Sequence, residues 1–231
     1  MLCSAFPDAD VYESVREFWN ARDSEDFDSK TRRSGRMEAI DLVAALAKPH
    51  VSREGVLTID LGCGTGLFAE SVGVKRVIGV DFSSPFLTAA RRRMDTVWQR
   101  NIFDLRLAES SVDNVVSLFV IDDYPSEKKR VFFTRIFSYL KADGCFFFAA
   151  YSPNDERMGS MREVINARTG VSFEIHLEDA SSYESMLRQC GFTIDRSEIL
   201  RTNGLYEEIA LKREFVVIVA RKPRVMPCRE P

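Results

Sequence analysis

The stretch Val56–Phe82, VLTIDLGCGTGLFAESVGVKRVIGVDF, decides the fold of this chain of 231 residues. An apolar run comes first and is followed by a glycine-rich turn. A stretch of helix length then leads to a second apolar run that ends in an acid. This order predicts a strand, a tight turn, a helix and a second strand, as in nucleotide-binding α/β folds. The distance along the chain from the turn to the second acid matches a bound nucleoside.

The residue types in this stretch fit such a site. Asp60 closes the first strand, and a helix expected over 67–72 begins after the turn with free amides that favour a carboxylate or polar ligand group. Asp81 ends the second strand, where the acid of a dinucleotide fold accepts hydrogen bonds from ribose hydroxyls. Glycine, which lets the backbone approach a ligand closely, recurs at alternate positions of the turn: Gly62, Gly64 and Gly66.

These residues resemble the class I S-adenosylmethionine-dependent methyltransferases, in which an acid, an apolar residue and three alternate glycines mark the first strand and turn. The sequence DLGCGTG at 60–66 fits that pattern, and the resemblance extends over roughly residues 36–221. Other stretches look like the family's second-strand motif, adenine-side loop, fourth strand and fifth strand: 77–83, 101–113, 115–121 and 140–151. The resemblance implies an α/β fold with a Rossmann-like, mostly parallel seven-stranded sheet, helices on both faces and an antiparallel last strand.

The resemblance also implies S-adenosyl-L-methionine as cofactor and S-adenosyl-L-homocysteine as product. The turn from Gly62 to Gly66, with Cys63 and Gly64, would pass beneath the methionine part of the cofactor, and Asp60 would lie near its ammonium group. Asp81 would bind the ribose hydroxyls.

The adenine side is less well defined by the sequence. Phe82 would lie against the adenine ring or pack in the core, and Asn101 and Ile102 would contact the adenine edge. Asn101 replaces the acid that is commoner in the family, and Asp104 is a competitor for that role.

The end of the fourth strand is the most individual part of the sequence: Phe119-Val120-Ile121-Asp122-Asp123-Tyr124-Pro125. In the family this strand end faces the sulfonium of the cofactor, which Phe119 would approach, and the substrate pocket. Adjacent side chains on a strand point to opposite faces, so we expect one of the two acids to enter the pocket, Asp122 ahead of Asp123, with Tyr124 beside it. There the acid would accept a proton from the substrate or hold a cationic group. It would otherwise cap the following helix. Methyl transfer needs mainly alignment, so a dedicated base is optional.

The first 35 residues are predicted to form a helical lid over the cofactor. Tyr12 and Trp19 would close the site or pack on the sheet, and Arg36 at the start of the next helix would reach the cofactor carboxylate. The methyltransferase domain is assigned to 36–221, with a substrate-side insertion at 152–180 and a tail at 222–231.

Composition narrows the function classes. A net charge of -3 shows no electrostatic footprint for nucleic acid or a membrane surface, so we expect a small-molecule acceptor, methylated on O, N or C. A role in specialised metabolism is what the resemblance to the family implies by analogy. The five cysteines are scattered and odd in number, which favours a reducing, cytoplasmic location. His50 and His176 have no metal-ligand spacing, so no metal site is expected.

Other functions are compatible with parts of the pattern. A nicotinamide cofactor fits the spacing of Gly64, Gly66 and Ala69, but Asp60 suits a cationic group better than a pyrophosphate and no second nucleotide-binding half follows. An enzyme of the same fold with another reaction, such as cyclisation or decarboxylation, and a non-catalytic methyltransferase-like partner protein remain the alternatives.

The remaining pattern predicts alternating strands and helices. A helix is expected over 10–20, a polar stretch over 21–34, and a helix over 36–47 that stops before Pro49. Further strands are expected over 56–60, 76–80, 96–99, 115–120, 145–151, 192–200 and 214–221, and further helices over 67–72, 84–94, 125–140 and 181–190.

Overall fold

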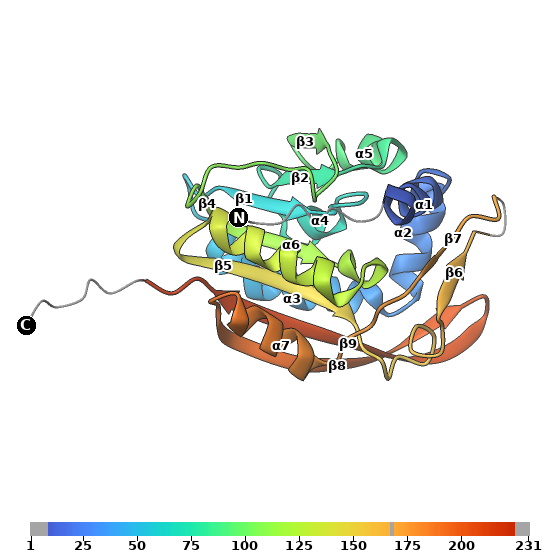
Figure 1. Ribbon diagram of the computed structural model, residues 1–231. Helices are drawn as coiled ribbons and strands as arrows, with labels where there is room; N and C mark the ends of the chain where they lie inside the picture. Colours follow the sequence, from blue (N-terminus) through green and yellow to red (C-terminus); the bar gives the residue numbers. More distant parts are fainter. Residues whose placement is uncertain (1–8, 167–168, 225–231) are drawn as a thin grey trace, which may run out of the picture.

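The computed structural model describes residues 9–166 and 169–224, which are built around a seven-stranded sheet in the order β3-β2-β1-β4-β5-β9-β8 (Figure 1). Neighbouring strands from β3 to β5 are parallel, whereas β9 runs antiparallel to both β5 and β8. The strands are β1 (Thr58–Leu61), β2 (Ile78–Asp81), β3 (Thr96–Gln99), β4 (Val112–Leu118), β5 (Leu140–Tyr151), β8 (Thr193–Tyr206) and β9 (Ile209–Arg221). The fold class predicted from the sequence is confirmed.

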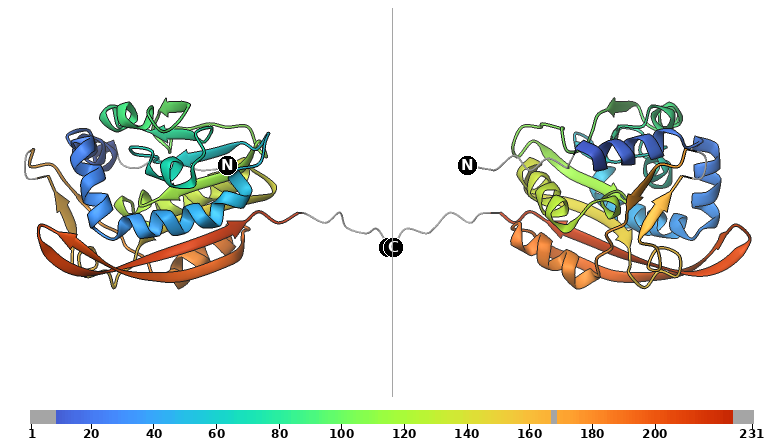
Figure 2. Two further views of the ribbon diagram at one scale, coloured as in Figure 1. Left: turned by 180° about the vertical axis from the view of Figure 1, so that it is seen from behind. Right: turned by 45° about the vertical axis from the view of Figure 1, so that its right-hand side comes forward.

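Helices cover both faces of the sheet, as two views from opposite sides show (Figures 1 and 2). One face carries α6 and α7, and the other carries α3, α4 and α5. The helices are α1 (Ala9–Asn20), α2 (Ser24–Arg33), α3 (Arg36–Val51), α4 (Leu67–Val72), α5 (Ser84–Ala90), α6 (Ser126–Tyr139) and α7 (Ala180–Gln189). None of the helices within the described ranges is long and apolar enough to cross a membrane.

Strand β5 shows how the sequence builds two cores from one sheet. Phe146 and Phe148 point toward α6 and α7, whereas Phe147 and Ala149 point toward α3 and α4. All four side chains are buried, as expected for an apolar run in a strand covered on both faces. The side chains that alternate along β5 therefore fill the two helix–sheet layers.

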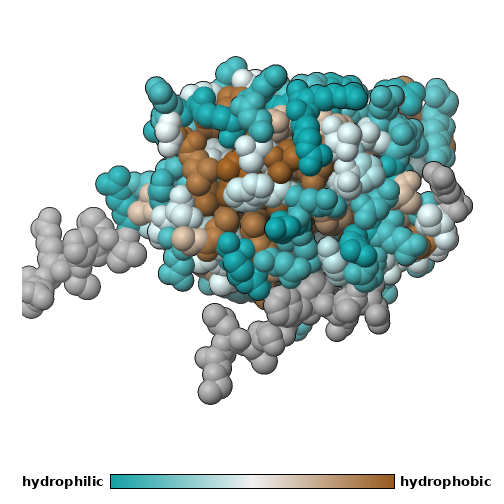
Figure 3. Space-filling view, turned by 90° about the horizontal axis from the view of Figure 1, so that it is seen from above, coloured by the Kyte–Doolittle hydropathy of each residue, from teal (hydrophilic) through white to brown (hydrophobic). Residues whose placement is uncertain are grey.

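Two edges bound the sheet. Strand β3 forms one edge, with Val97 and Trp98 half-buried. Seen from above, hydrophobic side chains gather in the middle of the visible face and hydrophilic ones surround them (Figure 3). Strand β8 forms the other edge, and its hairpin with β9 is much longer than the predicted strands. The hairpin closes tightly at Glu207 and Glu208, which both have positive φ, as type I′ turns require.

Two predictions near the N-terminus were wrong. The polar stretch over 21–34 contains helix α2, because Asp23 caps it through the amides of Glu25 and Asp26 and its charges follow the helix dipole. The helix predicted to stop before Pro49 instead continues to Val51. Val51 is buried, which favours the continuation, and Pro49 lies in the last turn, where its missing backbone N–H removes only one hydrogen bond. Residues 1–8 of the predicted lid and 225–231 of the predicted tail lie outside the described residues.

The segment predicted as an insertion, 152–180, leaves the main sheet after β5. It contains a small antiparallel hairpin of its own, β6 (Glu163–Ile165) and β7 (Ser172–Glu174), and β7 packs against α1. Both views show this hairpin on the side of the molecule where α1, α2 and the end of the β8–β9 hairpin also lie (Figures 1 and 2). This segment therefore borders the N-terminal helices.

A buried ion pair fixes the start of this segment. Asp155 accepts hydrogen bonds from Arg213 (Nε, 2.8 Å) and from the amides of Met158 and Glu214, and both charged side chains are at most 1% exposed. Arg213 also donates to the carbonyl of Ser34, just before α3. One guanidinium group thus joins β9, the insertion and the junction between α2 and α3.

Arg213→Met is expected to lower the free energy of unfolding by about 3–5 kcal/mol, because it leaves the Asp155 carboxylate buried without its cation. Arg196→Met is the matched control, since its pair with Glu198 is 49% and 30% exposed and solvent screens it, so its loss should change the free energy of unfolding far less. Urea unfolding measures both. Equal losses in the two variants would contradict a structural role for the buried pair.

Candidate active site

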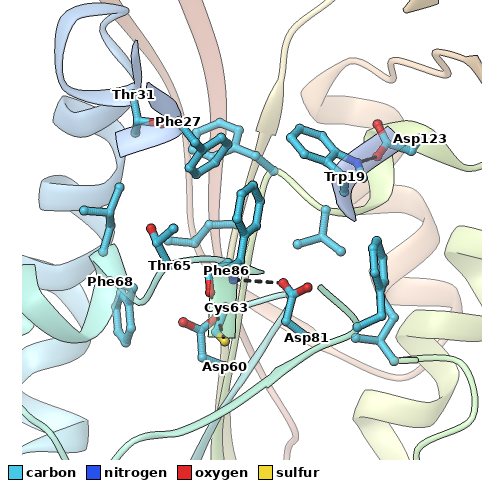
Figure 4. Close-up of a pocket in the computed structure, with 18 of the residues that line it drawn as sticks. Trp19, Phe27, Thr31, Asp60, Cys63, Thr65, Phe68, Asp81, Phe86 and Asp123 are labelled. Carbon is cyan, nitrogen blue, oxygen red and sulfur yellow. Dashed lines mark hydrogen bonds between the residues drawn. The ribbon is translucent and has the colours of Figure 1, made fainter. Parts of the chain in front are cut away.

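Most residues predicted to bind the cofactor line one pocket above the C-terminal ends of β1, β2 and β4 (Figure 4). Ligands of doubly wound α/β folds bind at this end of the strands. The predicted residues that line it are Trp19, Arg36, Asp60, Gly62, Cys63, Gly64, Asp81, Phe82, Ile102, Phe119 and Tyr124.

The glycine turn is held by backbone geometry. Gly62 and Gly64 have φ of 76° and 54°, and the Gly62 amide donates to the carbonyl of Val80 at 2.7 Å. A Cβ on Gly62 would lie 2.3 Å from Cγ2 of Val120, so no larger residue fits there. A Cβ on Gly64 would meet nothing closer than the Phe27 and Phe86 rings at 4.0 Å. The turn is therefore packed from below and open toward the pocket.

Asp81 joins the turn to the end of β2. Its Oδ2 accepts a hydrogen bond from the Gly64 amide at 2.9 Å, and its Oδ1 accepts one from the Ser83 amide at 2.8 Å. Burial raises the pKa of this carboxyl group, and the two amides oppose that rise. Each carboxylate oxygen keeps a further lone pair for a ligand hydroxyl.

Asp60 is a buried acid without a partner. Its exposed fraction is 2%, and among the described residues nothing donates a hydrogen bond to its carboxyl group or forms an ion pair with it. Burial, together with the nearby charge of Asp81, raises its pKa to about 8. An acid that faces a pocket in this state would be stabilised in its ionised form by a cationic ligand.

An aromatic wall lies across the pocket from these two acids. Trp19 of α1, Phe27 of α2 and Phe86 of α5 contact one another, with ring centroids 4.7–6.1 Å apart. In Figure 4 the rings of Trp19 and Phe27 lie opposite Asp60 and Asp81. Phe86 and Phe27 were not among the predicted site residues, since aromatic residues on short helices are indistinguishable from core residues in the sequence.

Helix α2 is also fixed to the far side of the glycine turn. Asp28 accepts a hydrogen bond from Thr65 Oγ1 and pairs with Arg93 at 2.8 Å. Arg93 and Arg32 both pair with Glu70 of α4. The N-terminal helices thus contact the element that begins directly after the glycines.

The two acids after β4 have exchanged their predicted places. Asp123 lines the pocket and accepts a hydrogen bond from Trp19 Nε1 at 3.1 Å, whereas Asp122 does not line it. Asp122 is 2% exposed and accepts hydrogen bonds from the Tyr151 amide at 3.2 Å and the Tyr183 hydroxyl at 3.1 Å. The reason is a 3-10 turn over Ile121–Asp123, which replaces the strand alternation assumed in the prediction.

Burial raises the pKa of both acids, to about 6 for Asp122 and about 8 for Asp123. The difference arises because Lys129, itself buried, and two hydrogen bonds favour the ionised form of Asp122, whereas the charge of Asp122 disfavours that of Asp123. Tyr124 is buried beside them, and its ring lies 4.8 Å from that of Phe103.

Three other predicted residues lie outside the pocket lining. Gly66, with φ of 85°, caps the start of α4, and Asn101 Oδ1 accepts a hydrogen bond from the Phe103 amide at 2.9 Å. Tyr12 packs edge-on against Phe82, with ring centroids 6.1 Å apart. Gly66 and Asn101 thus shape the local backbone, and Tyr12 supports Phe82 from behind.

Neither histidine belongs to the pocket. His50 Nδ1 lies 3.6 Å from Cys145 Sγ at the opposite end of the sheet, and His176 accepts a hydrogen bond from Lys129 through its carbonyl oxygen. Among residues 9–166 and 169–224, no group of three or more histidine, cysteine or acidic side chains is arranged to hold a metal ion.

The sheet order and the pocket at the C-terminal ends of β1, β2 and β4 are those of the class I S-adenosylmethionine-dependent methyltransferase fold. Comparison with known families agrees, because residues 59–148 match the family described as methyltransferase domain. The resemblance recognised in the sequence is confirmed.

Solved structures of the same fold cover nearly the whole chain. A complex named DhpI-SAH is 19% identical with a TM-score of 0.67, and covers 94% of this chain and 98% of that one. Magnesium protoporphyrin IX methyltransferase from Synechocystis with bound SAH is 17% identical with a TM-score of 0.65, and covers 92% and 100%. At these identities the likeness concerns the fold.

Among curated proteins, probable tRNA methyltransferase 9B of Mus musculus and of Bos taurus are each 27% identical over 79 residues. The match covers 34% of this chain and 18% and 17% of the two relatives. This chain therefore matches less than a fifth of the length of these proteins.

Asp60→Asn is expected to stabilise the unliganded protein by about 1–3 kcal/mol at pH 8 and by much less at pH 5. The folded pKa of Asp60 is raised to about 8 from an unfolded value near 4. Asp60 is therefore tolerated in the folded state below pH 4, and it destabilises that state increasingly as pH rises from 4 to 8. Asparagine cannot ionise, so it removes this penalty. Urea unfolding at both pH values measures the difference.

Asp113→Asn provides the opposite control. Hydrogen bonds from the Leu57 amide and Lys141 outweigh desolvation and hold the pKa of Asp113 below its usual value, so its loss should destabilise the protein at pH 8. A pH-independent effect of Asp60→Asn would contradict the raised pKa of Asp60.

Proposed function

We propose that this chain is an S-adenosyl-L-methionine-dependent methyltransferase that acts on O, N or C of a small molecule and releases S-adenosyl-L-homocysteine. The observation that carries the proposal is the convergence of the open Gly64 backbone, Asp60 and Asp81 on one aromatic pocket. The SAH-bound state of two structural relatives supports the choice of cofactor.

Different pocket residues would bind different parts of the cofactor. Asp81 would accept hydrogen bonds from the ribose hydroxyls, and Asp60, which lacks a cation in the protein, would face the ammonium group. Phe82, Ile102 and the residues around Asn101 would form the adenine side, and Arg36 would bind the carboxylate. When bound, the cofactor supplies an electrophilic methyl group.

The acceptor side is assigned to Asp123, Tyr124 and Phe119. Asp123 is the acid that the 3-10 turn directs into the pocket, so it takes the role first given to Asp122. Its carboxylate would orient the acceptor and take up a proton from a hydroxyl or amine. Since the pKa of Asp123 is raised to about 8, this uptake would strengthen as pH rises through 8.

A small-molecule acceptor is supported by the closed pocket and by the charge of the chain. Helices α1 and α2 place Trp19 and Phe27 across the pocket, and the net charge is -3. The two helices thus border the pocket, which supports the lid role expected of the first 35 residues. A cytoplasmic location remains a proposal from cysteine usage.

A tRNA acceptor is the second candidate, and the match to tRNA methyltransferase 9B over 79 residues favours it. A solved complex between the Haloferax volcanii Trm112 methyltransferase activator and a methyltransferase contains a chain that is 20% identical to this one with a TM-score of 0.61, which supports a test for an activating protein partner. Radiolabelled methyl transfer from the cofactor to bulk tRNA or to a small-molecule extract separates the candidates. Consumption of cofactor without formation of S-adenosylhomocysteine would identify cyclisation or decarboxylation instead.

Asp81→Ala is expected to weaken S-adenosylhomocysteine binding by about 1.5–3 kcal/mol, because charge-assisted hydrogen bonds to the ribose are lost. Calorimetric titration with S-adenosylmethionine, S-adenosylhomocysteine and NADH measures this. Asp95→Ala, an exposed acid before β3, should leave affinity unchanged. Equal affinity in folded Asp81→Ala would refute the ribose role, and binding of NADH alone would overturn the cofactor assignment.

Trp98→Phe leaves Trp19 as the sole tryptophan, and S-adenosylhomocysteine should change its fluorescence because its ring lines the pocket. The reciprocal Trp19→Phe keeps Trp98 on the β3 edge, which lies outside the lining, and should show little change. A fluorescence titration of both variants makes the measurement. A fluorescence change seen only in Trp19→Phe, which keeps Trp98, would contradict a ligand position beside α1.

A further inference from the structure

Near the pocket, Arg22 and Arg157 are two cations that no acid of the described residues neutralises, and neither belongs to the pocket lining itself. Among the described residues, neither guanidinium group has a carboxylate oxygen within 4.0 Å. Arg22 follows α1, and its Nε is buried without a hydrogen-bond partner. Arg157 belongs to the loop that follows β5. Unpartnered donors of this kind are costly in a folded protein unless a ligand satisfies them.

Aromatic rings hold both side chains in place. The Cζ atom of Arg22 lies 4.6 Å from the ring centroid of Phe18 and 5.9 Å from that of Trp19. The Cζ atom of Arg157 lies 3.6 Å from the ring centroid of Tyr206, at the end of β8. Because Trp19 lines the pocket, Arg22 is separated from the cavity by a single side chain.

The two arginines lie close enough for their charges to interact. The pKa of Arg22 is lowered, first by burial, and the charges of Arg157 and Arg36 lower it further, while Tyr206 opposes this. Arg36 lines the pocket and donates hydrogen bonds to the hydroxyl groups of Tyr151 and Thr31. Arg36 therefore lies in the pocket lining, and the charges of Arg36 and Arg157 both act on Arg22.

The neighbouring acids do not cancel this charge. Asp26 attracts Arg22 but pairs with Lys30 at 2.8 Å, and Glu208 at the hairpin end lies near Arg33. Inside the pocket, Asp123 has a pKa raised to about 8 and is largely neutral at pH 7. These acids therefore leave the charges of Arg22 and Arg157 without a direct partner.

We propose that Arg22 and Arg157, beside Tyr206, bind an anionic group of the methyl acceptor, a carboxylate or a phosphate. This inference rests on the proposed function and adds the substrate class. Arginine is suited to the role because its planar fork of donors matches both oxyanions. Arg36 remains assigned to the cofactor carboxylate, so its charge is neutralised when the donor binds, whereas Arg22 and Arg157 stay available.

The test measures thermal unfolding of the full-length protein, saturated with S-adenosylhomocysteine, at pH 7.5 and constant ionic strength. Sodium chloride is replaced stepwise by sodium benzoate, sodium phosphate or benzylamine hydrochloride. Benzoate and benzylamine share a ring and differ in charge, and the comparison of benzoate with phosphate distinguishes the two anions. Arg22→Gln and Arg157→Gln remove the cations one at a time. Arg16→Gln is the matched control, because Arg16 lies on α1, is half-exposed and pairs with Glu13.

At least one of the two anions should raise the unfolding midpoint of the wild type in a saturable way, and benzylamine should not. Arg22→Gln and Arg157→Gln should each raise the half-saturating anion concentration by about tenfold or more, whereas Arg16→Gln should not change it. Unchanged S-adenosylhomocysteine affinity, measured by calorimetry, shows that the variants are folded.

Stabilisation by benzylamine equal to that by benzoate, or an anion effect that survives both substitutions, would overturn the inference. Absence of any saturable anion effect would do the same. Failure of the wild type to bind S-adenosylhomocysteine would instead refute the proposed function. The anion titration of the unliganded protein would then show whether Arg22 and Arg157 bind an anion independently of that function.

Discussion

The hydrogen bond from the Gly64 amide to Asp81 is the constraint on which the site depends. It joins the turn after β1 to the end of β2, and the Gly62 amide reinforces it through the carbonyl of Val80. Both bonds require glycines with positive φ, a conformation that other residues adopt only under strain. Gly62 also packs against Val120, which begins the turn that carries Asp123. The donor side and the acceptor side of the pocket are therefore positioned by the same few backbone contacts.

Uncompensated charge is the second organising feature of the pocket. Asp60 and Asp123 form no ion pair with a described residue, and burial raises the pKa of each to about 8. Arg22 and Arg36 are cations without a carboxylate partner among the described residues. A buried charge that lacks a partner costs stability, so this arrangement favours ligands that bring the opposite charges with them. A donor with a cationic amino-acid end and an anionic carboxylate meets both requirements.

The sequence predicted the sheet and the cofactor side well, because both depend on local patterns. The run from Val56 to Phe82 contains the strand, the turn, the helix and the second acid within one continuous segment, and α4 and β3 have the predicted bounds. The acceptor side depends on contacts between distant segments. The exchange of Asp122 and Asp123 follows from a 3-10 turn, and the aromatic wall unites Trp19, Phe27 and Phe86 from three helices. Neither the rotation of a short turn nor the packing of separate helices leaves a periodic signal in the sequence.

The N-terminal helices border the pocket through a small set of polar and aromatic contacts. Trp19 is bound to Asp123 by one hydrogen bond, and Asp28 pairs with Arg93, whose side chain is 22% exposed. Ion pairs of that exposure contribute up to about 1 kcal/mol, and each aromatic contact of Phe27 adds about 0.5–1.5 kcal/mol. These contacts are only part of what holds the two helices, because Val15 and Phe18 of α1 are buried in the core. A ligand in the pocket would therefore lie against Trp19 and Phe27 of helices that core packing already holds in place.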